Sequence, residues 1–345
     1  MNTSYNRLVY YWLWSGVILI VLMAVIGGIT RLTDSGLSMS DWSLIMGAIP
    51  PLNEAEWMKA FTRYQEFPQF QQQNFDMQLH EFKGIFYWEY FHRLLGRLNG
   101  LIFLVPFLYF WIKGAFDSSL LKRMFILLGL GVMQGAMGWI MVKSGLVDVP
   151  YVSHYRLALH LILAMVIIGC CLWFALDLKY GLEPSLQEAA SFSINSWLIW
   201  IGILFIAQIL YGAFTAGMDA GVIYNTFPQM GGKWIPPSFS TLDPFILNLI
   251  ENPGTIQWMH RLLGTLLLIA VGMFWIRGVT GSTSKLLHAL SGILLCLIVL
   301  QYALGIYTLL QSVPVSLGVF HQLAAIIFWI CYLIIFNRSV KSASY

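Results

Sequence analysis

Long apolar runs separated by short polar segments dominate this chain. The runs lie at 12–30, 91–112, 122–142, 156–176, 195–216, 256–276, 286–309 and 316–336. Each is close to the ~20 residues that an α-helix needs to cross a bilayer. The runs are continuous and do not alternate with polar positions, which argues against a closed barrel. The pattern therefore predicts an all-α polytopic membrane protein with eight transmembrane helices.

Composition supports this prediction and excludes other classes. The chain has 345 residues, of which 58% are hydrophobic and 10% charged, with a net charge of +3. No soluble domain needs so much apolar surface. There is also no basic cluster of the kind that binds nucleic acid, so we expect no nucleic-acid partner. All four cysteines lie in predicted helices, and we expect no structural disulfide in an outer loop.

One short motif occurs twice, 168 residues apart. The copies are Glu89-Tyr-Phe-His92-Arg93-Leu-Leu-Gly96-Arg97 and Gln257-Trp-Met-His260-Arg261-Leu-Leu-Gly264-Thr265. Other features also recur: Gly27-x-x-Thr30 with Gly212-x-x-Thr215, and Gln134-x-x-x-Gly138 with Gln301-x-x-x-Gly305. We infer two four-helix halves, residues 1–180 and 190–345, joined by a polar linker near 177–194. Because each half has an even number of helices, the two pseudo-symmetric bundles form a parallel repeat.

Basic residues predict the orientation. With the N-terminus inside, the inner segments hold Arg7, Lys113, Lys122, Arg123, Lys179, Arg277, Lys285, Arg338 and Lys341. The outer segments hold Arg31, Lys59, Arg63, Lys83, Lys143, Arg156 and Lys233. The inner excess favours cytoplasmic N- and C-termini. The first apolar run is too long for a signal peptide and no transit peptide is evident, so a bacterial inner membrane fits best.

Four histidines lie within or at the ends of predicted helices, all near the outer, periplasmic face. They are His92, His160, His260 and His321. Two imidazoles on facing helices of a bundle are a common way to hold a haem iron from both sides. The alternative is that each histidine only makes an interhelical hydrogen bond. A zinc or copper site would require three or four close ligands. We interpret the other histidines, His80, His154 and His288, as solvated or interfacial.

The neighbours of these histidines favour haem. Gly96 and Gly264 follow His92 and His260 by one helical turn, where a flat macrocycle can lie against the helix. Arg93, Arg97 and Arg261 suit pairing with haem propionates. Without haem, the glycines would instead allow close helix packing. The arginines would instead snorkel, extending their charged ends to the membrane interface.

Glu89 distinguishes the two motif copies. It lies one turn before His92 on the same helix face, whereas the second copy has Gln257. A carboxylate beside a haem can move protons or stabilise a developing cation, and an amide cannot exchange a proton. We therefore expect a reacting haem beside Glu89 and only a resident haem beside Gln257. The alternative for Glu89 is a salt bridge to Arg93.

The first outer segment, about residues 31–88, is the longest. Asn53 followed by Glu56 predicts a helix N-cap with a reciprocal glutamate, hence a short surface helix. The segment carries many aromatic residues (Trp42, Trp57, Phe61, Tyr64, Phe67 and Phe70). These favour an ordered loop that packs on the bilayer or the bundle.

The motifs together resemble the haem A synthase family, in its branch with a long first loop and no loop cysteines. The resemblance spans nearly the whole chain. The segments that carry it are Gly-Gly-Ile-Thr30-Arg31-Leu-Thr-Asp-Ser-Gly36-Leu-Ser-Met-Ser-Asp-Trp42, Gly47-Ala-Ile-Pro50-Pro51-Leu, Lys83-Gly-Ile-Phe-Tyr-Trp-Glu89-Tyr-Phe-His92-Arg93, His260-Arg261 and His321.

The resemblance implies oxidation of the C8 methyl of haem O to a formyl group, by two successive hydroxylations, giving haem A for cytochrome c oxidase. It implies that Glu89, His92 and His160 form the substrate-haem site, and that His260 and His321 ligate a haem b cofactor. Expected partners are haem O, the haem O synthase that supplies it, an unidentified electron donor and the lipid bilayer. The oligomeric state and the source of the oxygen atoms are left open, as is which histidine leaves the iron.

Two other functions fit part of the pattern. A di-haem b-type cytochrome that takes electrons from quinol would use two equivalent haems, which the Glu89–Gln257 difference disfavours. A transporter with a parallel repeat would have broken helices at mid-membrane depth, whereas the polar residues here lie near one face.

Overall fold

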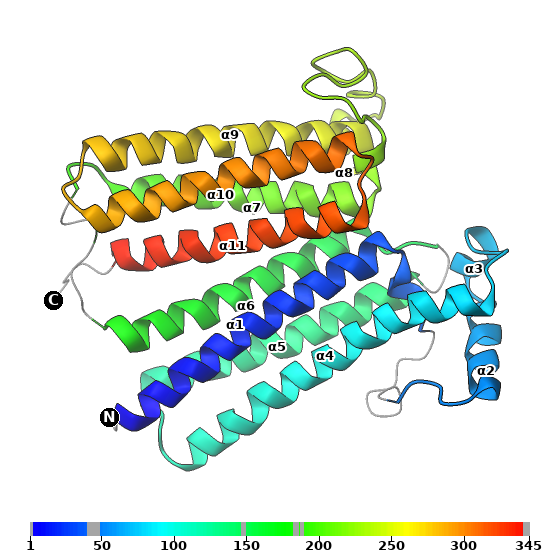
Figure 1. The fold of residues 1–345 in the computed structure, drawn as a ribbon, viewed down its shortest axis with the longest axis horizontal. Helices are drawn as coiled ribbons and strands as arrows, with labels where there is room; N and C mark the ends of the chain where they lie inside the picture. Colours follow the sequence, from blue (N-terminus) through cyan, green and yellow to red (C-terminus); the bar gives the residue numbers. More distant parts are fainter. Residues whose placement is uncertain (1–2, 40–48, 146–149, 182–185, 187–189, 341–345) are drawn as a thin grey trace.

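The computed structural model describes residues 3–39, 49–145, 150–181, 186 and 190–340, and within these ranges it is helical with no β-strand. Eight of the described helices are long and apolar enough to cross a membrane. The prediction of an all-α, multi-pass membrane protein is thus confirmed. The long helices run roughly along one direction, and both chain ends lie at the same end of the bundle (Figure 1). We call the opposite end, which carries the short helices, the loop end.

The first half contains four of the long helices. They are α1 (Thr3–Leu32), α4 (Leu79–Ile112), α5 (Ser118–Gly145) and α6 (His154–Tyr180). Between α1 and α4 come the 3-10 helix η1 (Ser35–Leu37) and the short helices α2 (Glu54–Tyr64) and α3 (Pro68–Gln72). These short elements lie at the loop end (Figure 1).

The second half contains the other four. They are α7 (Ile194–Gly217), α9 (Pro253–Thr280), α10 (Lys285–Leu310) and α11 (Val315–Val340). Between α7 and α9 come the 3-10 helices η4 (Ala220–Val222) and η5 (Phe245–Leu247) and the short helix α8 (Asn248–Glu251).

Helix contacts correspond between the halves. In the first half α1 packs on α4 and α6, and α5 packs on α6; in the second half α7 packs on α9 and α11, and α10 packs on α11. The halves meet where α1 and α6 contact α7 and α11. This pairing is compatible with a parallel repeat, and the division into residues 1–180 and 190–345 stays a prediction.

Two helix starts differ from the sequence prediction. The apolar run at 91–112 belongs to a helix that begins at Leu79, inside the segment expected to be loop. This first part escaped detection because it is not apolar throughout. It is started by Glu81, whose Oε2 accepts a hydrogen bond from the backbone N of Gln78 at 2.8 Å, and it buries Phe82 and Phe86. The first helix likewise begins at Thr3 and not near residue 12.

The surface helix predicted from Asn53 is confirmed as α2. The Asn53 side chain accepts from the backbone N of Glu56 at 3.0 Å, and Glu56 accepts from the backbone N of Leu52 at 2.8 Å. Trp57, Phe61 and Tyr64 of α2 are buried against α4, as expected of an ordered loop. Trp42 lies outside the described residues.

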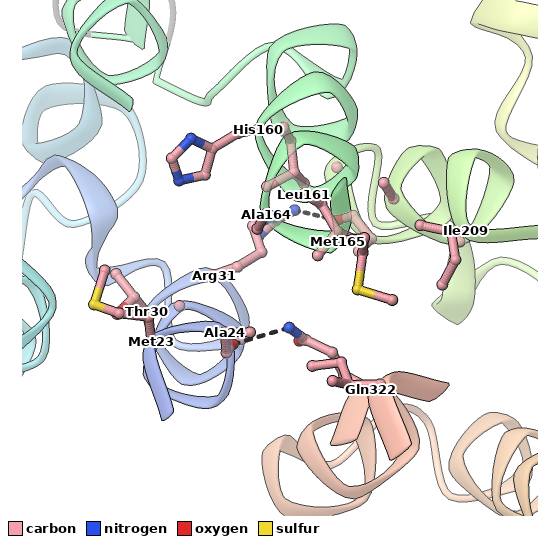
Figure 2. A pocket seen from close by; sticks show the side chains of 18 of the residues that line it. Met23, Ala24, Thr30, Arg31, His160, Leu161, Ala164, Met165, Ile209 and Gln322 are labelled. Atoms are coloured by element: carbon pink, nitrogen blue, oxygen red, sulfur yellow. Dashed lines mark hydrogen bonds between the residues drawn. The ribbon is translucent and has the colours of Figure 1, made fainter. Parts of the chain in front are cut away.

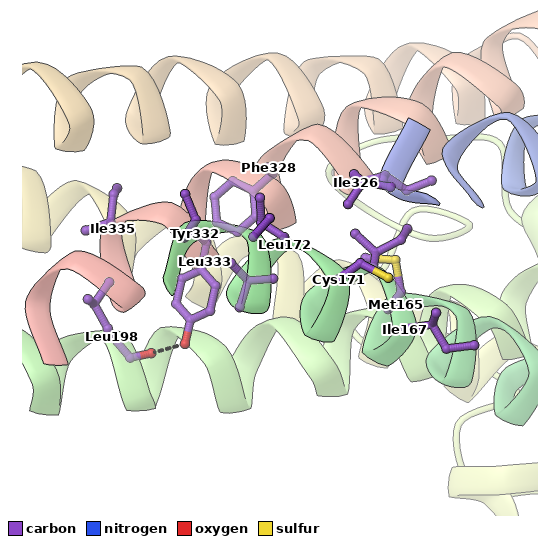
Figure 3. Close-up of a cluster of buried hydrophobic side chains, with 14 of the residues drawn as sticks. Met165, Ile167, Cys171, Leu172, Leu198, Ile326, Phe328, Tyr332, Leu333 and Ile335 are labelled. Carbon is purple, nitrogen blue, oxygen red and sulfur yellow. Dashed lines mark hydrogen bonds between the residues drawn. The ribbon is translucent and has the colours of Figure 1, made fainter. Parts of the chain in front are cut away.

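The interior between the halves is apolar and rich in aromatic side chains. Residues from α6, α7 and α11 interdigitate there (Figure 3). Tyr332 of α11 reaches across to α7, where its hydroxyl donates to the carbonyl of Leu198 at 2.9 Å. The ring can approach this closely because residue 202 is glycine, and a Cβ there would overlap the Tyr332 hydroxyl.

Polar contacts also tie the halves together near their ends. Asn337 donates to Asp177 at 2.9 Å, while at the loop end Nε2 of His154 lies 2.9 Å from the carbonyl of Ile250. His154, which the sequence analysis interpreted as solvated or interfacial, is partly buried in this contact between the halves.

Gly202→Ala tests the crossing of α7 and α11. We expect a loss of ~1–3 kcal/mol of stability, the usual cost of overpacking a filled core, measured by thermal unfolding of the purified protein. Gly272→Ala is the matched control, because a Cβ on Gly272 meets no atom within 4 Å. Tyr332→Phe in the Gly202→Ala background should recover part of the loss; no recovery would contradict this account of the crossing.

Candidate functional site

One cavity of about 2470 Å³ is lined by residues of both halves, and all four predicted site histidines line it. Glu89, Arg93, Arg97, Gln257 and Arg261 line it as well. Figure 2 shows the ring of His160 projecting from α6 into this space, which Met23 and Thr30 of α1 also line. The structure thus brings together every residue that the sequence singled out for the site.

Each histidine ring lies against a glycine of a neighbouring helix. A Cβ built on the glycine would come within 2.9–3.1 Å of Cε1 of the ring in the four pairs His92–Gly27, His160–Gly138, His260–Gly212 and His321–Gly305. The 2.9 Å contact at Gly305 is one that real Cβ atoms essentially never make, and the other three contacts are tighter than nine in ten real Cβ contacts. The glycines therefore make the room in which the imidazoles sit.

The two histidines of the second half face one another across the cavity. The ring centroids of His260 and His321 are 6.4 Å apart, with an angle of 79° between the planes. Two metal–imidazole bonds of ~2 Å, with about 1 Å from each nitrogen to its ring centre, give a similar separation. In addition, Nδ1 of all four site histidines is buried without a hydrogen-bond partner among the described residues. The pair fits one metal ion held from both sides.

Three of the histidines share a glutamine contact that sequence reasoning only partly found. The amide nitrogens of Gln134, Gln208 and Gln301 lie 3.3–3.4 Å from Nε2 of His160, His260 and His321 respectively. In each case the glutamine lies four residues before the glycine that packs on the same ring. The sequence analysis noted this Gln-x-x-x-Gly pattern at Gln134 and Gln301 and missed the third copy, Gln208 and Gly212. At the equivalent place on α1, the residue four positions before Gly27 is Met23 and not glutamine.

Glu89 is a buried carboxylate with three donors. Its Oε2 accepts from the hydroxyl of Ser38 and from the backbone N of Met39, both at 2.7 Å. Its Oε1 is paired with Arg93. The salt bridge considered as the alternative is therefore present, and it lies on the cavity wall.

The arginine that follows each motif histidine holds a loop. Arg93 donates to the carbonyl of Met39 at 3.0 Å, and Arg261 donates to the carbonyl of Tyr224 at 2.7 Å. Met39 and Tyr224 occupy the same place after α1 and α7, beyond an aspartate in left-handed conformation, Asp34 or Asp219. Both loops are thus clamped in the same way onto α4 or α9.

Gln257 contacts its loop with opposite polarity. Its amide nitrogen donates to the carbonyl of Tyr224 at 3.1 Å, whereas Glu89 accepts from the backbone N of Met39. The second site therefore has the same loop and the same arginine clamp but no buried negative charge at this position. The replacement of Glu89 by Gln257 therefore changes the charge of the site and leaves the loop contacts in place.

The glycines one turn after the motif histidines accommodate neighbouring side chains. A Cβ on Gly264 would lie 3.1 Å from Nε2 of Gln208, and one on Gly96 would lie 3.5 Å from Cε of Met23. Both glycines line the cavity. Gly264 makes room for Gln208 of α7, which contacts His260, whereas Gly96 only lies at an ordinary distance from Met23 of α1.

Comparisons with known proteins identify the family of the chain. The family model described as cytochrome oxidase assembly protein, COX15-CtaA, matches residues 10–333. The chain belongs to this family. Among its relatives, the heme A synthase of Nitrosospira multiformis is 44% identical over 319 residues, which are 92% of this chain and 89% of that protein. The heme A synthase of Flavobacterium johnsoniae is 41% identical over 329 residues, which are 93% and 94% of the two chains.

A third relative, the heme A synthase of a Wolbachia from Brugia malayi, is 38% identical over 339 residues, which are 96% of this chain and 99% of that protein. The family resemblance read from the sequence is confirmed. The comparisons do not support the alternative of a quinol-oxidising di-haem cytochrome.

Gly305→Ala tests whether glycine makes the room for His321. The added methyl would push the ring out of line, and we expect haem affinity in the second half to fall ~10-fold or more, as when other ligand-orienting contacts are lost. Haem content per protein and the absorption spectrum measure this. Gly292→Ala in the same helix is the control, because its Cβ would meet only an ordinary contact at 3.7 Å. Unchanged haem content in Gly305→Ala would contradict the role of the glycine.

Proposed function

We propose that this protein is a haem A synthase, which oxidises the C8 methyl of haem O to a formyl group for cytochrome c oxidase. Membership of the family supports this activity, as does the similarity to proteins named heme A synthase. The observation that carries it is the asymmetry of the cavity. Both halves have a histidine pair, and only the first has a buried carboxylate at the motif position.

We assign the substrate haem O to His92 and His160 and a haem b cofactor to His260 and His321. The 6.4 Å separation of the second pair supports a bis-imidazole site. When bound, haem b would supply one-electron transfer between the substrate site and an outside partner. Arg93, Arg97 and Arg261 supply positive charge for the propionates, and the loop carbonyls orient Arg93 and Arg261.

Conversion of the methyl to a formyl group removes four electrons and leaves one oxygen atom on the carbon. Two successive two-electron hydroxylations give a geminal diol, which loses water to form the aldehyde. If water supplies the oxygen atom, each hydroxylation releases two electrons and two protons, and the electrons go to an outside acceptor. If dioxygen supplies it, dioxygen takes the two electrons from the carbon and two more from an electron donor, and its second oxygen atom leaves as water. As hydrogen leaves the methyl carbon together with the bonding electrons, positive charge would develop there, and we assign its stabilisation to the Glu89 carboxylate. Because Ser38, Met39 and Arg93 hold the carboxylate in one position, it needs no reorganisation when the charge develops.

We place the protein in a bacterial inner membrane, with cytoplasmic termini and the haem sites near the periplasmic face. The excess of basic residues in the segments at the end that carries the termini supports this orientation. The proposed partners are the haem O synthase, an electron donor and surrounding lipid; self-association is a further option.

Glu89→Gln separates catalysis from haem binding. The amide keeps the shape and an acceptor oxygen but loses the charge, so haem should still bind while the rate of haem A formation falls on the order of 10²–10⁴-fold. Haems extracted from the purified protein and identified by chromatography measure both quantities. Glu66→Gln, an exposed position in the first loop, is the control. Wild-type haem A output from Glu89→Gln would rule out this role for the carboxylate.

A further inference from the structure

The cavity extends further in the first half than in the second. Along α4 its lining runs from Glu89 to Leu104, whereas along α9 it stops at Leu267. Aligned on the motif histidines, Leu267 corresponds to Asn99, so the first-half cavity reaches ~7 Å further along its helix, at 1.5 Å per residue. The additional lining includes Leu101 of α4 and Val132 of α5, both more than half exposed. In a membrane-spanning helix such side chains face lipid.

The reason for the difference lies in how the helices pack. α9 and α10 lie in close contact, whereas α4 and α5 touch at few positions. In the second half Ile298 of α10 lines the cavity and is only 3% exposed. Tyr302 then joins the two helices, because its hydroxyl lies 2.9 Å from the hydroxyl of Thr265.

The first half has glycine at both of these positions. Aligned on Gln134 and Gln301, Ile298 corresponds to Gly131 and Tyr302 corresponds to Gly135. Both glycines line the cavity, and a Cβ on either would meet no atom within 4 Å. Glycines spaced four apart in membrane helices usually allow a neighbouring helix to approach closely. Here none of the described residues comes within 4 Å of a Cβ on either glycine, and we infer that the two glycines form the floor of a groove between α4 and α5.

This groove leads from the lipid-facing side to the histidine of the substrate site. Gly131, Gly135 and Gly138 follow one another along α5, and Gly138 packs on the ring of His160. The distance from Gly131 to Gly138 along the helix is ~10 Å. Its other wall includes apolar residues of α4, among them Leu101, Ile102 and Leu104.

We propose that the groove between α4 and α5 binds the farnesyl tail of haem O and admits this substrate sideways from the bilayer. This inference rests on the proposed function, because that function supplies a substrate with a long isoprenoid chain. The groove is apolar, open toward lipid and continuous with the His92–His160 site. In the second half, to which a tail-less haem b is assigned, the side chains of Ile298 and Tyr302 occupy the corresponding part of the cavity wall.

Transplanting the second-half side chains tests the groove. Gly131→Ile and Gly135→Tyr are made in the full-length protein with haem b in place. The substrate site is titrated with haem O and with protohaem, which lacks the tail. We expect the affinity for haem O to fall on the order of ten-fold or more, since several buried methylenes lose their contacts, with protohaem affinity little changed. Gly129→Ile is the control, because Gly129 is on α5, open within 4 Å and outside the cavity lining.

The outcomes are distinct. If both variants retain haem b and bind haem O as tightly as the Gly129→Ile control, the groove proposal is overturned. If co-purified phospholipid falls while haem O binding stays unchanged, the groove holds an acyl chain and the proposal is equally wrong. Equal losses for haem O and protohaem would indicate general damage to the site and also overturn it. Failure of the wild-type protein to make haem A would instead refute the proposed function. The titration with haem O measures binding alone, so it tests the groove separately from this activity.

Discussion

The structure depends on one steric constraint, which is that an imidazole inside a tightly packed helical bundle needs a place without a side chain opposite it. Four glycines on four different helices meet this need, one for each histidine. A methyl group at any of them would come within about 3 Å of the ring. The constraint sets the crossing of α1 on α4, α5 on α6, α7 on α9 and α10 on α11, and so the shape of the cavity.

At the loop end, backbone carbonyl groups of the loops accept hydrogen bonds from arginine side chains in the same way in both halves. Where backbone leaves a helix near a membrane, its donors and acceptors need partners. Arg93 and Arg261 supply them to the loops after α1 and α7. Arg31 joins these two loops, since it pairs with both Asp34 and Asp219 at 2.8 Å. The two sites therefore share a common polar layer.

The long first loop supports the feature that makes the first site different. Tyr64 of α2 donates to Gln69 at 3.0 Å, and Gln69 donates to the carbonyl of Asp34 at 2.8 Å. Asp34 begins the turn that presents Ser38 and Met39 to Glu89. An ordered loop thus fixes the donors that keep a carboxylate buried. The second half places an amide at this position, which needs no such support.

The sequence by itself determined the eight helices, the paired histidine motifs and the Glu89–Gln257 difference, because apolar length and polar residues in apolar runs are local signals. The resemblance to a family supplied the roles expected of these residues. Only the tertiary structure decided which glycine lies against which histidine, that Arg93 and Arg261 hold loop carbonyls, and that Gly131 and Gly135 are open where Ile298 and Tyr302 are packed. The physical reason is that packing joins residues far apart in the chain. Whether a glycine admits a helix, a ring or a lipid tail depends on what the neighbouring helix places opposite it.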